Sequence, residues 1–276
     1  MTDFVRVYLS GNPVHDRVLR AFADGIPGAN LIEGWEYEPS SVAVIFGVYK
    51  SKVPLSYPRG EVFQRQRKKN LDVVVLETGY INRGDGETHH YAAGFNGLNG
   101  RADFRNDGSP PDRAMKLGVE LKPYHDGDYI VLCSQVPWDA SVDGTDHARW
   151  VHETAEQVRH FSFRPIKFRP HPMARGVIPV PKDCELSEVP LSEDLKNAHA
   201  VLAFNSNSGV EALLDGVASF AFDRGSMAWR MSNRSLLSID FPSRPDRSQW
   251  LNNLCYAQWT IDEMRCGEAW AHLSKG

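Results

Sequence analysis

The sequence predicts an α/β protein built from two lobes, each with its own parallel sheet. Short apolar runs alternate with helical stretches in residues 4–76 and again in residues 129–222, which is the pattern of strand–helix–strand units. The residues between these regions, 79–127, are rich in Gly, Asn, Asp and Pro and lack the alternation. A chain of 276 residues is long enough for two domains that each bury a core. We expect one lobe over residues 1–125 and a second over 126–276, facing each other across a cleft.

The first lobe is predicted to start with a strand over residues 4–9 and a helix over 14–23. An uninterrupted apolar run over 42–46 is typical of a parallel strand that is buried on both faces. A helix through the basic segment that follows and a strand over 71–76 complete an open parallel sheet.

Residues 79–127 are expected to be irregular and to include the crossing between the lobes. The second lobe then begins with a strand over 129–133 and a helix over 146–161, capped by Thr145 or Asp146. The remaining elements are strands over 165–168, 200–204 and 218–222, a helix over 210–214, and short helices over 248–273.

Composition excludes several classes of protein. Hydrophobic residues make up 42% of the chain and charged residues 24%, which is ordinary for a globular protein. The N-terminus lacks the pattern of a signal peptide, and no stretch approaches the roughly 20 apolar residues of a membrane helix. The four cysteines show no CxxC spacing, so neither a zinc site nor a disulfide framework is indicated. We expect a reduced, cytoplasmic protein whose net charge of −4 does not attract nucleic acid generally.

The charge is nevertheless uneven along the chain. Seven basic residues and one acid, Glu61, lie between Lys50 and Lys69, a local excess of six positive charges. A solvated helix face is one interpretation of such a run. The other is a docking surface for an anionic acceptor on the first lobe, with contacts from Arg65, Arg67, Lys68 and Lys69.

Four polar clusters follow predicted strands, where ligands bind in parallel α/β sheets. This placement brings polar groups to the edge at which a pocket is expected. The clusters are residues 77–80, Ser134-Gln135, residues 169–172 and residues 205–211.

The last cluster reads Asn-Ser-Asn-Ser-Gly-Val-Glu and opens a helix. Free backbone N–H groups at the start of that helix, with the hydroxyls of Ser206 and Ser208, would suit a phosphate. The alternative is simple helix capping by Ser206 or Ser208, with Gly209 allowing close packing.

Arg169 and His171 lie on either side of Pro170, which restricts the backbone. Together they suit a diphosphate and the stabilisation of a departing phosphate, although a surface turn would also explain them. Glu77 ends an apolar strand of the first lobe and is the candidate general base, with a helix cap or a surface ion pair as the alternative. Asp139 and Asp143 are weaker candidates for the same role.

With these residues in view, the sequence resembles the capsular polysaccharide biosynthesis transferases, the bacterial Kdo-transferase and polysialyltransferase-like group. Three segments carry the resemblance, in the order in which the family has them. They are Glu77-Thr78-Gly79-Tyr80-Ile81 (an acidic–acidic–Gly–aromatic–aliphatic turn in the family), Arg169-Pro170-His171-Pro172 (the His-Pro motif) and the Ser-rich loop and helix over 205–213. The departure is Thr78, where the family often has a second acid.

The resemblance implies a GT-B fold with two Rossmann-like lobes and sugar transfer from a nucleotide-activated donor without a bound metal or another cofactor. It implies that Arg169, His171, Ser206 and Ser208 hold the donor, and that Glu77 matches an acidic residue of the catalytic turn. The compact chain and its basic helix would also suit a phage-type transferase that glycosylates modified bases in DNA.

Two other motifs do not fit their usual contexts. Asp126-Gly127-Asp128 matches the DxD motif that holds a metal in GT-A transferases, but it precedes its strand and so lies at the wrong end of the sheet. Ser208 resembles the nucleophile of a Gly-x-Ser-x-Gly elbow, but Ser206 stands where the first Gly is needed.

We therefore expect a metal-independent glycosyltransferase that acts on a hydroxyl of a glycan or of a modified base in phage DNA. A sugar-nucleotide epimerase of the same fold and a nucleotide-binding protein without catalysis are the alternatives. Glu77 and His171 are the expected catalytic residues. The expected donor-binding residues are Ser134, Gln135, Arg169, His171, Asn205, Ser206, Ser208, Gly209 and Glu211.

Overall fold

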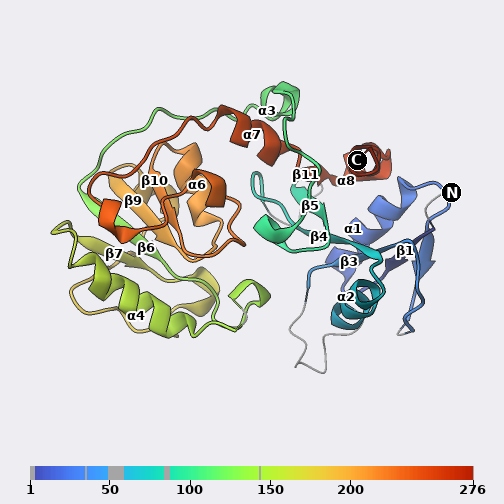
Figure 1. The fold of residues 1–276 in the computed structure, drawn as a ribbon, viewed down its shortest axis with the longest axis horizontal. Coiled ribbons are helices and arrows are strands. Elements are labelled where there is room, and N and C mark those ends of the chain that lie inside the picture. Colours follow the sequence, from blue (N-terminus) through green and yellow to red (C-terminus); the bar gives the residue numbers. More distant parts are fainter. Residues whose placement is uncertain (1–3, 35, 49–58, 84–87, 143, 276) are drawn as a thin grey trace. The chain divides into compact units, whose positions relative to one another are not determined.

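The computed structural model describes residues 4–34, 36–48, 59–83, 88–142 and 144–275. The chain divides into two compact units: unit 1 comprises residues 1–113 and 252–276, and unit 2 comprises residues 114–251. Each unit is built on one sheet, so the predicted α/β class with two sheets is confirmed (Figure 1).

Unit 1 contains a six-stranded sheet in the order β11-β5-β4-β3-β1-β2. Four neighbouring strands are parallel, and three of them match the apolar runs predicted as strands. The parallel strands are β1 (Val5–Tyr8), β2 (Asn30–Ile32), β3 (Val42–Phe46) and β4 (Asp72–Thr78). The last two strands, β5 (His90–Phe95) and β11 (Gln258–Thr260), run antiparallel to their neighbours.

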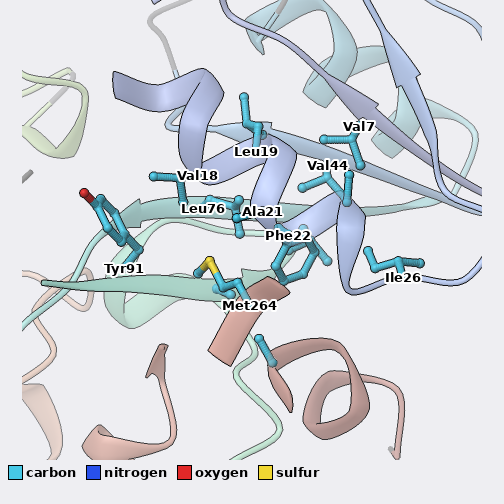
Figure 2. Close-up of a cluster of buried hydrophobic side chains, with 14 of the residues drawn as sticks. Val7, Val18, Leu19, Ala21, Phe22, Ile26, Val44, Leu76, Tyr91 and Met264 are labelled. Atoms are coloured by element: carbon cyan, nitrogen blue, oxygen red, sulfur yellow. The ribbon is translucent and has the colours of Figure 1, made fainter. Parts of the chain in front are cut away.

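Helices cover both faces of this sheet. On one face, α1 (Pro13–Asp24) and α8 (Ile261–Arg265) pack on the alternate strand residues that include Val44. Phe22 of α1 and Met264 of α8 lie in this one cluster, which explains why the C-terminal segment belongs to unit 1 (Figure 2). On the other face, Val62 of α2 (Arg59–Lys68) packs on the remaining strand residues.

Unit 2 contains five parallel strands in the order β10-β9-β6-β7-β8. These are β6 (Tyr129–Cys133), β7 (Ile166–Arg169), β8 (Glu185–Leu186), β9 (Ala198–Ala203) and β10 (Ala218–Ala221). Residues of α4 (His147–Val158) pack on one face, and residues of α5 (Leu191–Leu195) and α6 (Ser208–Leu214) pack on the other. Asp146, one of the two predicted caps, caps α4, because its carboxylate accepts a hydrogen bond from Arg149 N at 3.0 Å.

The remaining helices are α3 (Asp112–Leu117), α7 (Ser248–Cys255) and α9 (Glu268–Leu273). Within the described part of the chain, no helix has both the length and the apolar character needed to cross a membrane.

The expectation that residues 79–127 are irregular throughout and that the first sheet is purely parallel is wrong. Strand β5 lies in this stretch and joins β4 to β11. Its sequence, His-Tyr-Ala-Ala-Gly-Phe, lacks the β-branched residues that mark a strand, yet all six residues are buried. Partners on both sides therefore make it a strand, and those partners are distant in the sequence.

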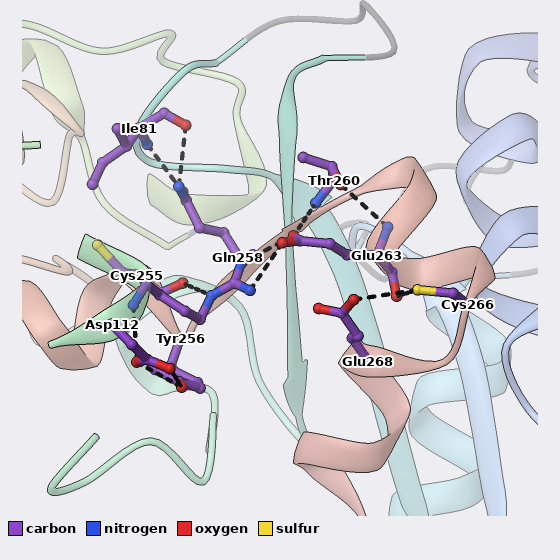
Figure 3. A network of polar contacts seen from close by, with 10 residues as sticks. Ile81, Asp112, Cys255, Tyr256, Gln258, Thr260, Glu263, Cys266 and Glu268 are labelled. Atoms are coloured by element: carbon purple, nitrogen blue, oxygen red, sulfur yellow. Dashed lines mark hydrogen bonds and ion pairs between the residues drawn. The ribbon is translucent and has the colours of Figure 1, made fainter. Parts of the chain in front are cut away.

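The compact units differ from the predicted division at residue 125 in two segments. Residues 114–125 belong to unit 2, and residues 252–276 return to unit 1. The return is anchored by Arg113, whose guanidinium forms two hydrogen bonds of 3.0 Å with the Glu263 carboxylate. Arg113 also donates to the backbone oxygens of Cys255 and Gln258, at 3.0 and 2.9 Å. Figure 3 shows the polar network of this returning segment.

Candidate functional site

Gln135 and Asn205, which follow β6 and β9, are joined side by side at the carboxyl edge of the unit 2 sheet. Gln135 Nε2 donates to Asn205 Oδ1 at 2.7 Å, and Asn205 N donates to Gln135 Oε1 at 3.0 Å. Their remaining amide hydrogens go to Ser141 Oγ, Ser141 O and Asp223 Oδ1. Both side chains are buried and fully hydrogen-bonded. They therefore brace the loops that follow β6, β9 and β10, and their amides already have protein partners.

Ser134 also belongs to this framework. Its N–H donates to Arg169 O at 2.9 Å, which ties the end of β6 to the end of β7, and its hydroxyl donates to Gln135 O at 3.2 Å. The three predicted donor residues of this group thus lie together at the expected edge, where they hold the backbone in place.

Arg169 is engaged with a buried carboxylate. Its Nη1 lies 3.2 Å from Asp194 Oδ2 and also donates to Val189 O, and Ser187 Oγ donates to the same carboxylate. Asp194 is fully buried, so its charge requires these partners and the nearby Lys167 ammonium at 3.7 Å. The guanidinium that the sequence assigns to a diphosphate therefore balances a charge at the β7–β8 side of the sheet.

His171 is partly exposed just after β7. Its Nδ1 accepts a hydrogen bond from Met173 N at 3.2 Å and caps the 3-10 helix Pro172–Ala174. With Nδ1 as acceptor, a neutral ring carries its proton on Nε2.

The loop Asn205–Gly209 uses its own groups to start α6. Ser208 N donates to Ser206 Oγ at 3.2 Å and Gly209 N donates to Ser206 O at 3.2 Å. The expectation of free N–H groups is therefore wrong for these two residues. A Cβ on Gly209 would lie 3.0 Å from Ser219 Oγ and 3.2 Å from Ala228 Cβ, so this glycine allows α6 to approach β10 closely.

Two further members of this cluster are placed differently. The hydroxyl of Ser208 is buried, and the Cys133 thiol lies beside it; burial raises the pKa of that thiol to about 12. Glu211 is partly exposed, and its Oε1 accepts a hydrogen bond from Asn207 Nδ2 at 3.1 Å. Glu211 thus borders the loop, whereas Ser208 lies inside it.

A residue that the sequence interpretation missed lies in the loop after β6. Trp138 is 59% exposed and therefore presents part of its ring to solvent. Its loop is held by the contacts of Ser141 with Gln135 and Asn205. Asp139 accepts from Ser141 N at 2.8 Å and shapes the same loop, while Asp143 lies outside the described residues. The available signal was an aromatic residue following a polar strand end.

A buried histidine supports the same framework. Gln135 N donates to His147 Nε2 at 2.8 Å, and the ring stacks on Trp150 with centroids 5.1 Å apart. Burial lowers the pKa of His147 to about 4, so the imidazole is neutral at physiological pH. Neutrality is required here because Nε2 accepts the backbone hydrogen bond.

In unit 1, Glu77 lies at the carboxyl end of β4, as predicted. A Cβ on Gly47, which follows β3, would be 3.4 Å from both Glu77 Oε2 and Arg59 Nη1. The other carboxylate oxygen accepts from Thr78 N at 2.8 Å. Burial and the nearby Glu77 carboxylate raise the pKa of Tyr80, which belongs to the following turn.

His15 completes a group of three ionisable side chains at this edge. Asn12 caps α1 by accepting from Val14 N and His15 N, which sets His15 in the first turn. Its ring stacks on Phe46 with centroids 4.1 Å apart, and Arg59 Nη2 lies 3.0 Å from its Nδ1. Burial and the charge of Arg59 lower the pKa of His15. The sequence interpretation overlooked His15 and counted Arg59 only as one charge of a basic run.

The other basic residues of α2 lie at the opposite end of β4. Arg67 Nη1 donates to Leu71 O at 3.3 Å and lies 3.5 Å from the carboxylate of Asp72, the first residue of the strand. Five residue-to-residue steps along the strand, about 16 Å, separate Asp72 from Glu77. Arg65 pairs with Glu61 at 2.5 Å, and Lys68 and Lys69 are exposed. Lys50 and Lys52 lie outside the described residues. The structure thus brings Arg59 to Glu77 and places the predicted acceptor cluster elsewhere.

The Asp-x-Asp sequence has protein partners at the amino end of β6. Asp126 pairs with Arg244 and lies 3.3 Å from His199 Nδ1, and Asp128 accepts from Asn197 Nδ2 at 2.8 Å. Among the residues that the structure describes, no group of three or more His, Cys, Asp or Glu side chains is arranged to hold a metal.

Comparison with known proteins identifies the fold. No family model and no curated protein sequence matches the chain. Two solved structures of KpsC from Thermosulfurimonas dismutans are similar. The beta Kdo 2,4 transferase has a TM-score of 0.61 and 15% identity, covering 93% of this chain and 90% of that chain. The beta Kdo 2,7 transferase has a TM-score of 0.55 and 14% identity, covering 96% and 99%. The fold is thus glycosyltransferase-like, of the GT-B kind, and the resemblance to Kdo transferases is confirmed in the fold.

We expect His147 to make the stability of the protein depend on pH. Below pH 6.5 the unfolded chain protonates this imidazole and the folded chain does not, so stability falls until the pH reaches about 4. The loss is about 3 kcal/mol in total, from the difference between the two pKa values. Urea unfolding between pH 7.5 and 4 should therefore show a shallower pH dependence for His147→Phe than for the wild type. Trp150→Phe, in the same aromatic cluster, should lower stability equally at every pH; identical slopes for wild type and His147→Phe would contradict the assignment.

Proposed function

We propose that the protein is a glycosyltransferase that moves a sugar from a nucleotide-activated donor to a hydroxyl acceptor. The observation that carries this proposal is the set of polar residues at the carboxyl ends of β6, β7 and β9, on a fold shared with two Kdo transferases. In parallel α/β sheets this edge binds nucleotides and other phosphorylated ligands.

The donor is held by the residues of unit 2 that present groups to solvent. His171 donates from Nε2 to a phosphate oxygen, Ser206 adds a hydroxyl, and Trp138 stacks on a planar ring of the donor. Gln135 and Asn205 act behind them by fixing the loops, and Arg169 does so by neutralising Asp194. A ligand site with a rigid buried support of this kind is organised before the ligand arrives.

Glu77 of unit 1 is the general base. Its carboxylate takes the proton of the acceptor hydroxyl while that oxygen forms a bond to the anomeric carbon of the sugar. The bond between this carbon and the donor phosphate breaks, and its electron pair leaves with the phosphate. His171 stabilises the charge that develops there.

We also propose that transfer needs no divalent metal. The leaving phosphate is met by the His171 imidazole, and the Asp-x-Asp carboxylates are already paired with Arg244 and Asn197 at the amino edge of the sheet. That edge is opposite to the one that carries the donor residues.

Donor binding should depend on His171 and Trp138. Each Ala variant is expected to raise the donor Kd by about 5- to 150-fold, the equivalent of roughly 1–3 kcal/mol, because a hydrogen bond to a charged oxygen or a stacking surface is lost. Isothermal titration with CMP-, UDP-, GDP- and ADP-sugars identifies the donor and measures the change. Met173→Ala, two residues from His171 and exposed, is the matched control and should bind normally. An unchanged Kd in His171→Ala would remove the imidazole from the site.

Glu77→Gln should bind donor like the wild type and transfer sugar about 10²–10⁴-fold more slowly, because the amide cannot accept the proton. Asp72→Asn makes the same chemical change at the other end of β4 and should retain its rate. Radiolabelled donor with an acceptor panel gives the rates. Full transfer activity in Glu77→Gln would disprove the assigned base, and conversion of donor to its epimer without acceptor would favour an epimerase.

The acceptor is proposed to carry an anionic group that binds Arg59 beside the base. Arg59→Ala should therefore raise the acceptor KM about tenfold and weaken its dependence on salt, since one charge-assisted contact is lost. The double variant Lys68→Ala, Lys69→Ala removes two charges at and just beyond the other end of the same helix and should match the wild type. If KM rises in the double variant and not in Arg59→Ala, the acceptor binds instead at the C-terminal end of α2, and DNA stays a candidate acceptor.

A further inference from the structure

The turn that follows Glu77 is closed by a side chain from the C-terminal segment. Gln258 of β11 is fully buried, and its Oε1 accepts hydrogen bonds from Tyr80 N at 2.6 Å and Ile81 N at 3.0 Å. Its Nε2 donates to Ile81 O at 3.2 Å (Figure 3). One amide therefore satisfies three backbone groups of the turn, which have no ladder partner once β4 has ended at Thr78.

The turn fits around this amide closely. A Cβ on Gly79 would lie 2.5 Å from His90 O and 2.9 Å from Gln258 Oε1, so only glycine allows the approach. Gly79 N donates to His90 O at 2.9 Å, which fixes the residue immediately before the two amides that Gln258 binds. The backbone conformation of Glu-Thr-Gly-Tyr-Ile thus depends on Gln258, which lies 178 positions after Tyr80 in the chain.

Gln258 is itself held rigidly. It pairs with Ala92 in the ladder of β11 and β5, and Ala92 pairs with Glu77 in the ladder of β5 and β4. Its carbonyl accepts from Arg113 Nη2 at 2.9 Å, and Arg113 is fixed by Glu263. Glu263 also forms a capping box with Thr260 at the start of α8. The support of the turn is therefore connected to the buried ion pair that anchors the returning segment.

We infer that Gln258 is a positioning residue for the base: it fixes the backbone of residues 79–81, and through this turn the carboxylate of Glu77. This inference rests on the proposed function of Glu77. The carboxylate is bonded to the backbone immediately before the turn, since Thr78 N donates to Glu77 Oε1 at 2.8 Å, so a displaced turn shifts the end of β4 and with it the base. A shift of about 1 Å in a reacting group costs up to about 100-fold in rate.

Gln66 of α2 provides a matched control. It is also a fully buried glutamine of unit 1, and it bonds to Ser40 and Asp72 through Nε2, at 2.9 and 3.1 Å, and to Tyr37 through Oε1 at 2.7 Å. These contacts lie before β3 and at the first residue of β4, at the amino edge of the same sheet. Gln66→Ala and Gln258→Ala therefore break a similar number of buried hydrogen bonds at opposite ends of the same strands.

The test compares the two Ala variants with Glu77→Gln by urea unfolding, donor titration, transfer kinetics and hydrogen exchange of peptides that cover residues 77–81. Both Ala variants should lose stability. Gln258→Ala should lower kcat by about 10- to 100-fold with unchanged donor Kd, and should speed exchange at Tyr80 and Ile81. Gln66→Ala should keep the kcat of the wild type, and hydrogen exchange in the turn should stay as slow as in the wild type. Equal kcat in the two Ala variants would overturn the inference.

Gln258→Glu keeps the test decisive if Gln258→Ala does not fold. Its carboxylate still accepts from Tyr80 N and Ile81 N, but only the protonated acid donates to Ile81 O. Its kcat relative to wild type should therefore rise as the pH is lowered, and a ratio independent of pH counts against the inference. Full activity in Glu77→Gln would overturn the proposed base, whatever Gln258 does. A slow Glu77→Gln beside a normal Gln258→Ala would overturn the positioning role alone.

Discussion

The buried ion pair between Arg113 and Glu263 is the constraint on which unit 1 depends. Both side chains are more than nine-tenths buried, and removing either would leave an unpaired charge in the interior, at a cost of about 3–5 kcal/mol. Arg113 is the last residue of the first segment of unit 1, and Glu263 belongs to the segment that returns. The pair therefore joins the two segments, and it sets the position of β11, whose pairing with β5 completes the sheet.

Buried amides then determine which polar residues remain for a ligand. Gln135 with Asn205 in unit 2, and Gln258 in unit 1, bind backbone or side-chain groups at the carboxyl ends of the strands. A buried amide must satisfy its own donors and acceptors, so it fixes several loops at once and is lost as a ligand contact. The hydrogen bonds of these amides therefore make the loops rigid, and they also reduce the number of polar groups that can contact a ligand. The residues that we propose act on a ligand, His171 and Glu77, stand on this fixed support.

The sequence predicted the parallel strands well because β3, β4 and β6 are continuous apolar runs, and it predicted the edge that carries the polar clusters. It could not predict β5, whose small residues become a strand only between two distant partners. It also identified Arg169 without Asp194, the buried carboxylate 25 positions later that takes its charge. Pattern indicates where a polar side chain lies along the fold, whereas its partner is decided by tertiary contacts.

The direction of α2 explains why one helix carries both a solvated cluster and a residue of the candidate site. The helix begins with Arg59 beside Gly47 at the carboxyl edge and ends with Arg67 beside Asp72 at the amino edge. Basic residues in the last turn are stabilised by the helix dipole, so Arg67 and Lys68 need no ligand to explain them. Arg59 stands in the first turn, where the dipole opposes a positive charge. The positive charge of Arg59 therefore requires compensation from the groups around it. These groups are the Glu77 carboxylate and the neutral ring of His15, and they lie at the edge at which α/β sheets bind ligands.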